Sequence, residues 1–261
     1  MGIFNANELF GNRKEKAEKL FKQGDELLLS NKYAESVIYY KKAIKAYARC
    51  FDAYTNLGYA LIILGEYEEG IKYCDKALAL NPQDASEIYF VKAECLRKMG
   101  KYHDALDNYE EALKIRKKAF YLISMATLFY DMEEYDKAMK IFDMLEILNL
   151  EDNDDLERVF VYKGKIMEKQ GRFKEAIEYF DKALEINPGN AEIYDKKGSS
   201  LYYLGRDTDD MSLVKESIVY YKKALEIDEE YLHSINGIAV SLEVLGNTDE
   251  ALVYYDKALE A

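Results

Sequence analysis

Residues 51–84, FDAYTNLGYALIILGEYEEGIKYCDKALALNPQD, decide the fold, because their pattern recurs from near the N-terminus to the end of the chain. Apolar side chains at spacings of three and four predict an amphipathic helix over about 52–64 and a second over about 67–80. Gly65 ends the first helix, since glycine tolerates the left-handed cap conformation. Pro82 stops the second helix. Such a helix pair cannot bury its apolar face alone and must stack on copies of itself.

Seven copies of this pattern can be aligned, over residues 17–50, 51–84, 86–118, 119–152, 157–190, 191–231 and 232–261. Every copy has a small residue at its eighth position, namely Gly24, Gly58, Ala93, Ala126, Gly164, Gly198 or Ala239. Gly58 and Gly70 lie inside predicted helices, where glycine costs about 1 kcal/mol relative to alanine. We therefore expect both glycines to mark places where two helices approach closely.

This repeat resembles the tetratricopeptide repeat. Residues 51–84 share its length, an aromatic residue at position 4, Leu-Gly at positions 7 and 8, small residues at positions 20 and 27, and proline at position 32. The resemblance implies an all-α fold, a right-handed α-solenoid (superhelix) of helix-turn-helix repeats over residues 17–261. Residues 1–16 are then an N-terminal leader outside the repeats.

The composition limits the function classes. A formal net charge of −13 argues against a nucleic-acid partner, because phosphate binding requires a basic surface. Three cysteines are too few, and odd in number, for a disulfide framework, and the sequence has neither a signal peptide nor a membrane-spanning stretch. We therefore expect a cytoplasmic protein without membrane contact. Metal-binding, nucleotide-binding and hydrolase motifs are missing, so we expect no catalytic residue, no metal and no cofactor.

Two acidic insertions interrupt the repeats. Residues 153–156 precede the fifth repeat, and we expect Asp154 or Asp155 to cap the helix that follows. Residues 207–213 lie within the sixth repeat, where we expect a longer turn or a second helix extended at its N-terminus. Neither insertion has the alternating ligands of a calcium loop.

In the tetratricopeptide family, the first helix of each repeat lines a concave groove with its residues at positions 2, 5, 9, 12 and 13. The resemblance therefore implies a peptide- or protein-binding groove that contains Tyr59, Phe90, Glu94, Phe120, Ile123, Thr127, Tyr130, Arg158, Val161, Lys165, Ser199 and Tyr202. Over the full set of these positions, from the first repeat to the last, the groove is first acidic, then apolar, then basic, then mixed in character. We expect a non-enzymatic protein–protein interaction scaffold whose partner inserts an apolar side chain midway along the groove.

One subtype of the family binds chaperones by clamping a C-terminal carboxylate with lysine, asparagine and arginine side chains. Asn56 fits that clamp, but Asp25 and Glu87 replace clamp residues and would repel a carboxylate. We therefore do not expect this binding mode in the first three repeats.

Two alternatives stay open. The last helix leaves Leu252, Tyr255 and Leu259 without a following repeat to cover them, so the chain could be a self-assembling unit that forms homo-oligomers through its C-terminal end. It could also be a regulatory segment of a larger protein.

Overall fold

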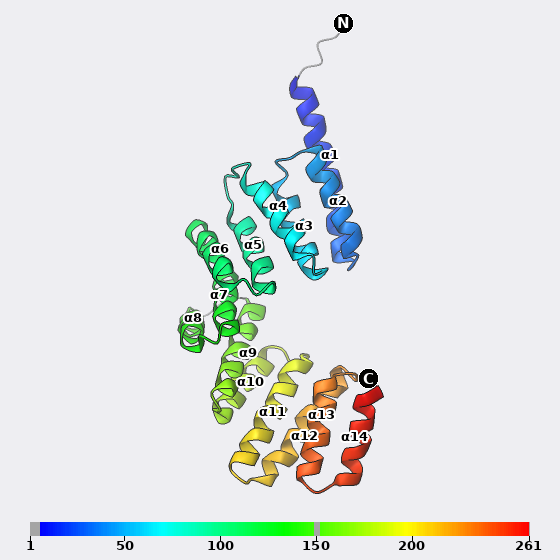
Figure 1. Ribbon diagram of the computed structural model, residues 1–261, viewed down its shortest axis with the longest axis vertical. Helices are drawn as coiled ribbons and strands as arrows, with labels where there is room; N and C mark the ends of the chain where they lie inside the picture. Colours follow the sequence, from blue (N-terminus) through cyan, green and yellow to red (C-terminus); the bar gives the residue numbers. More distant parts are fainter. Residues whose placement is uncertain (1–5, 149–151, 261) are drawn as a thin grey trace. The chain divides into compact units, whose positions relative to one another are not determined.

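The structure, a computed structural model, describes residues 6–148 and 152–260, and within these ranges it contains fourteen α-helices and no strand (Figure 1). Contacts between residues divide the chain into two compact units, residues 1–128 and 129–261. The boundary falls within α7 (Ala119–Asp131). The predicted all-α solenoid of helix-turn-helix repeats is confirmed.

The helices alternate as first and second members of the predicted repeats. The first unit contains α1 (Ala6–Leu29), α2 (Tyr33–Ala46), α3 (Phe51–Ile63), α4 (Tyr67–Leu78), α5 (Ser86–Lys98) and α6 (Tyr102–Ile115). The second unit contains α8 (Tyr135–Ile147), α9 (Asn153–Lys169), α10 (Phe173–Ile186), α11 (Ala191–Asp207), α12 (Met211–Ile227), α13 (Leu232–Val244) and α14 (Thr248–Glu260). First helices of consecutive repeats touch one another, as α3 touches α5 and α11 touches both α9 and α13.

The first helix extends beyond the first predicted repeat. It begins at Ala6, so the described part of the predicted leader continues the helix of residues 17–29. Residues 11–16 of this extension are exposed to solvent. Residues 1–5 of the predicted leader lie outside the described residues.

The turn between the two helices of a repeat contains a residue with positive φ. Gly65 has φ +76°, which confirms the predicted left-handed end of α3. Gly100, Gly171 and Gly246 adopt the same conformation at the equivalent place. Glu133 stands there in the fourth repeat with φ 60°, a backbone conformation that is costly for a residue with a side chain.

Two helical glycines permit close contact between helices, as expected. A Cβ on Gly58 of α3 would lie 2.3 Å from Cγ1 of Val91 on α5. A Cβ on Gly70 of α4 would lie 2.7 Å from Sγ of Cys95 on α5. The second and third repeats therefore pack at distances that only glycine allows at these two positions.

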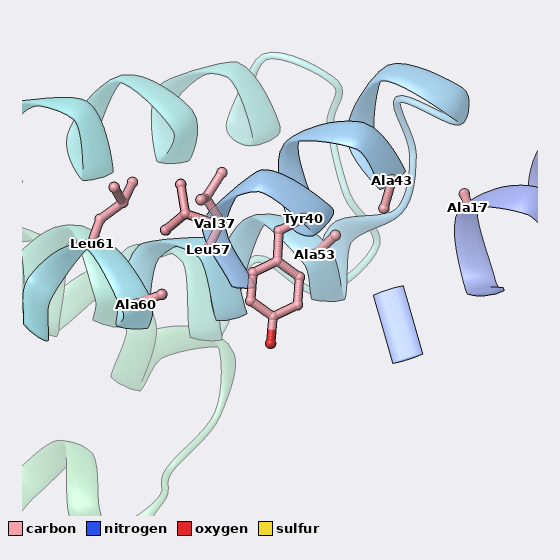
Figure 2. Close-up of a cluster of buried hydrophobic side chains, with 8 residues drawn as sticks. All are labelled: Ala17, Val37, Tyr40, Ala43, Ala53, Leu57, Ala60 and Leu61. Atoms are coloured by element: carbon pink, nitrogen blue, oxygen red, sulfur yellow. The ribbon is translucent and has the colours of Figure 1, made fainter. Parts of the chain in front are cut away.

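Each unit has its own apolar core. In the first unit the core is a cluster on α1, α2 and α3, drawn in Figure 2, of Ala17, Val37, Tyr40, Ala43, Ala53, Leu57, Ala60 and Leu61. The ring of Tyr40 is fully buried, and its hydroxyl lies at the margin of the cluster, where it donates to Oδ1 of Asp25 at 2.8 Å. In the second unit Tyr221, Ile238, Leu242 and Ala251 form a cluster across the last two repeats.

The acidic insertions become parts of helices. Asp152, and not the expected Asp154 or Asp155, caps α9, because its carboxylate accepts hydrogen bonds from the backbone amides of those two residues. In the sixth repeat both helices are lengthened to 17 residues, and they meet in a short turn in which Asp210 caps α12. The insertion thus extends the first helix as well as the second.

Candidate functional site

Two adjoining hollows lie along the first helices of the second unit. The larger, which we call the lysine–aromatic pocket, has a volume of about 470 Å³ and is lined by Tyr130, Tyr162, Lys165, Glu168, Lys169, Phe173, Lys196, Ser199 and Tyr203. The smaller, which we call the polar pocket, has a volume of about 170 Å³ and is lined by Ser199, Tyr202, Tyr203, Tyr221, His233, Asn236, Gly237 and Val240. Ser199 and Tyr203 line both hollows, so the two adjoin, and together we call them the groove.

The helical period places the lysines of the larger pocket. On α9, Lys165 and Lys169 are four residues apart, so both side chains lie on one face of the helix. On α11, Lys196, Ser199 and Tyr203 follow at spacings of three and four. Since α9 and α11 contact each other, these two faces together form the pocket wall.

Aromatic rings form the apolar part of the lysine–aromatic pocket. Phe173 of α10 stacks on Tyr203 of α11, with ring centroids 5.3 Å apart. Tyr130 meets Tyr162 edge to face at 5.4 Å, and Tyr162 in turn stacks on the buried ring of Phe142. Such ring pairs are favourable geometries that hold the walls in place before a ligand arrives.

The three lysines of this pocket differ in their partners. Lys165 Nζ lies 2.5 Å from a carboxylate oxygen of Glu192 and 5.1 Å from the centroid of the Tyr162 ring. Lys196 Nζ lies 3.7 Å from Oδ2 of Asp195. Lys169 is exposed and makes no ion pair with any residue that the structure describes. At least one ammonium group is therefore available to a ligand.

Two carboxyl groups belong to this region, namely that of Glu168 in the lining of the lysine–aromatic pocket and that of the buried Asp195. Burial raises the pKa of Glu168, although a hydrogen bond from Ser200 Oγ (2.8 Å) and the nearby Lys196 and Lys165 oppose the increase. Asp195 is fully buried, and its Oδ1 accepts hydrogen bonds from His233 Nδ1 at 2.7 Å and Ser234 Oγ at 2.8 Å. Asp195 thereby joins α11 to α13 beneath the polar pocket.

Four of the twelve predicted groove residues line these pockets, namely Tyr130, Lys165, Ser199 and Tyr202. Arg158 is exposed but lies outside both pockets, with Nη1 3.7 Å from Oδ1 of Asp155.

Other predicted groove residues are buried. Ile123 is fully covered, Thr127 is 3% exposed and its hydroxyl donates to the carbonyl of Ile123, and Val161 is also buried. The expectation that these three side chains face an open groove is corrected here. Ile123 and Thr127 are buried because their helix, α7, is apolar on nearly all sides and is covered on more than one side.

The predicted groove residues of the first unit make an internal cluster. Phe90 is buried, stacks on Tyr121 at 4.8 Å and meets Phe120 edge to face at 5.0 Å. Tyr59 donates a hydrogen bond to Glu87 at 3.3 Å. Glu94 accepts hydrogen bonds from Tyr109 and from Arg97, and Glu87 also pairs with Lys118. The carboxylates of this region are therefore bound to side chains of the same unit.

Several pocket residues were not predicted. Tyr162 and Lys196 both occupy the sixth position of their repeats, so the sixth position should have been included with the groove positions. Glu168 occupies the twelfth position, as Tyr130 and Tyr202 do. Phe173 belongs to a second helix, and a rule restricted to first helices cannot find it.

Comparisons with known proteins identify the repeat. Two family models, both described as "Tetratricopeptide repeat", match residues 49–118 and 158–190. The TPR repeat-containing protein MJ1428 of Methanocaldococcus jannaschii is 25% identical over 247 residues, which are 94% of this chain and 38% of the relative. The Hsp70-Hsp90 organizing protein of Triticum aestivum is 26% identical over 176 residues, which are 66% of this chain and 30% of the relative. The chain thus spans well under half the length of these two curated relatives.

Solved structures share the fold. A tetratricopeptide repeat protein from Parabacteroides merdae aligns with a TM-score of 0.68 at 15% identity, covering 94% of this chain and 93% of that structure. The APC/C hetero-tetramer Cut9-Hcn1 aligns with a TM-score of 0.73 at 17% identity, covering 90% of this chain and 44% of that chain. Within the described residues, none of the helices combines the length and the apolar character that a bilayer crossing requires.

Proposed function

Because the chain is a tetratricopeptide repeat protein, we propose that it is a non-enzymatic protein–protein interaction scaffold, and that the groove formed by its lysine–aromatic and polar pockets binds a segment of a partner protein. The name of one relative, an Hsp70-Hsp90 organizing protein, describes a protein that brings others together and is in keeping with such a role.

The observation that carries this proposal is that the two pockets adjoin. They share Ser199 and Tyr203, so a single ligand can occupy both. In an extended peptide, every second side chain points to the same side, at a separation of about 7 Å. Two such side chains can therefore enter adjoining pockets while the peptide backbone lies along α9, α11 and α13.

The proposal concerns the second unit because Asn56 and Glu87, two polar residues at the clamp positions of the first unit, are already bound. Asn56, the residue that fits the carboxylate clamp of chaperone-binding relatives, donates its Nδ2 hydrogen bond to Oδ1 of Asp25 at 2.8 Å. Glu87 is held by Lys118 and Tyr59. A ligand carboxylate at this place would have to displace these bonds and approach two negative charges.

A photo-crosslinking amino acid placed at Tyr203 tests the proposal. Tyr203 is 48% exposed and lines both pockets, whereas Val219 on α12 is 51% exposed and lines neither. We expect irradiation of the full chain in its native lysate to give a discrete protein adduct from position 203 and none from the matched control at position 219. Adducts of equal yield from both positions, or from 219 alone, would show that the groove is not the binding surface.

Self-association is the second candidate function. It is favoured by α14, on which Leu252, Val253 and Leu259 are 55%, 65% and 86% exposed. If these side chains join two copies, the mass measured by light scattering will rise with protein concentration, and Leu252→Lys with Leu259→Lys will abolish the rise. A constant monomer mass over the whole range would rule out this function.

A further inference from the structure

The lining of the lysine–aromatic pocket contains more basic than acidic side chains, whereas the unit around it contains more acidic ones. Residues 129–261 contain 16 Lys or Arg and 31 Asp or Glu, a formal charge of −15. The pocket lining nevertheless has three lysines and a single carboxyl group, that of Glu168. Lys165 and Lys196 each lie close to a carboxylate outside the lining, so Lys169, which makes no ion pair with a described residue, is the cation that favours an anionic ligand group at this point.

Two of the lysines are held by carboxylates that do not line the pocket. Lys165 is paired with Glu192, and Lys196 lies 3.7 Å from Oδ2 of the fully buried Asp195, an oxygen that has no hydrogen-bond partner among the described residues. Their side chains are 19% and 24% exposed, so their positions are restrained. Lys169, in contrast, is exposed and makes no ion pair with a described residue. An incoming anion thus meets two positioned ammonium groups and one free to close over it.

The walls of the pocket are flat and apolar beside these ammonium groups. Phe173 and Tyr203 form one stacked pair, and Tyr130 and Tyr162 form an edge-to-face pair. Aromatic side chains in a partner gain both buried area and ring–ring contacts from such walls. The anionic group and the apolar group of the ligand must therefore lie close together.

We propose that the lysine–aromatic pocket recognises an acidic residue that directly adjoins an aromatic residue in an extended segment of the partner protein. This inference rests on the proposed function of the groove and specifies the chemistry of its ligand. A single-stranded nucleic acid would also present anions and rings, but its phosphate chain would continue past the pocket over a unit of charge −15.

The test uses blocked synthetic peptides and the full chain. The probe has the centre Glu-Glu-Phe within glycines, and two control peptides have the centres Glu-Glu-Ala and Lys-Lys-Phe. Binding is followed by chemical shifts of backbone amides and by calorimetry. We expect the probe to bind at least about fivefold more tightly than either control and to bind more weakly as salt is added.

Two lysine variants locate the binding site. Lys169→Glu reverses a charge in the pocket, and Lys215→Glu makes the same change at an exposed lysine on α12 that lines neither pocket. We expect about five- to tenfold weaker binding of the probe by the first variant and unchanged binding by the second. Equal loss in both, no loss in either, or tighter binding of a six-nucleotide RNA than of the probe would overturn the proposed ligand chemistry.

The two proposals fail separately. If position 203 crosslinks a protein partner while the Glu-Glu-Phe peptide binds no better than its controls, the ligand chemistry is wrong and the groove function stands. If position 203 gives no specific adduct while the peptide binds in a Lys169-dependent way, the pocket chemistry is correct and the partner is not a protein captured through this groove.

Discussion

The third and fifth repeats, one in each unit, fill the same two positions with different chemistry. In the third repeat, Tyr109 at position 24 is buried and donates its hydroxyl to Glu94 at position 9. In the fifth repeat, Phe180 is the buried ring at position 24, and Lys165 stands at position 9. Phe180 has no hydroxyl oxygen that could accept a hydrogen bond from the Lys165 ammonium group, and this group pairs with Glu192 beside the pocket.

The difference concerns the contact between position 24 and position 9 within a repeat. In the first and third repeats position 24 is tyrosine, and its hydroxyl donates to the acidic residue at position 9, as Tyr40 does to Asp25 and Tyr109 to Glu94. In the fifth repeat position 24 is phenylalanine, and Lys165 at position 9 lines the lysine–aromatic pocket. The unit with the bound acids has a formal charge of +2, from 20 basic and 18 acidic residues, and the unit with the open pocket has −15. Net charge alone therefore does not locate the lysine–aromatic pocket, because the unit that contains it is the more acidic one.

Removing the aromatic ring at position 24 should have the largest effect on stability. Phe180 is fully buried, and Phe180→Ala should lower the free energy of unfolding by about 3–5 kcal/mol through the cavity it leaves. Chemical denaturation measures the loss, and Val219→Ala at an exposed site should change stability by no more than about 0.5 kcal/mol. A loss below 1 kcal/mol for Phe180→Ala would mean that position 24 is not a common core position.

Removing one hydroxyl in the first unit should have the next largest effect. Tyr109→Phe leaves Glu94 without its buried donor and should cost about 2 kcal/mol, because hydrogen bonds to charged groups are worth about 1.5–3 kcal/mol. Burial and the Glu94 charge raise the pKa of Tyr109 well above 10.0. Its protonated form is therefore favoured in the fold, and this stabilisation is complete below pH 10.0 and is lost as the pH rises above it. Denaturation between pH 8 and 11 should show a steeper loss for the unaltered chain than for Tyr109→Phe.

Transferring the first unit's pair into the second should abolish the difference in ligand capacity. Lys165→Glu with Phe180→Tyr recreates the tyrosine–acid pair in the fifth repeat, so the new carboxylate should turn inward and one pocket lysine is lost. We expect binding of the Glu-Glu-Phe peptide to weaken about tenfold, or about 1.4 kcal/mol. Phe180→Tyr alone is the control and should keep most of the affinity. Full affinity in the double variant would contradict the link between positions 24 and 9.

The smallest effect concerns the turns. Gly65 adopts φ +76° and has no Cβ atom to crowd the backbone. Glu133 adopts φ 60° with a Cβ atom, which makes this conformation costly. Glu133→Gly should therefore raise the free energy of unfolding by about 1 kcal/mol, and Gly65→Ala should lower it by a similar amount. Thermal melting of the two variants compares them, and a stabilising Gly65→Ala would refute the explanation.

The sequence predicts the fold well because turn and packing residues repeat in it. Gly65 and Gly58 each specify a local backbone requirement that the structure confirms. The groove is harder to predict. A side chain at a groove position is exposed only if neighbouring helices cover a single face of its helix. The helix of Ile123 and Thr127 is apolar all round, so two nominal groove positions are buried there. Phe173 reaches the pocket from a second helix, which depends on packing that no single-helix pattern records.

The sixth repeat shows which changes in length a helical hairpin can accept. Its seven additional residues are divided between its two helices: α11 has 17 residues where α3 has 13, and α12 has 17 where α10 has 14. One turn of helix takes 3.6 residues, so each arm gains about one whole turn and its later side chains keep their direction. Divergence by insertion or deletion should therefore proceed in steps of about seven residues per hairpin. An insertion or deletion of five residues would rotate the later side chains of one helix about its axis and turn its apolar face toward water.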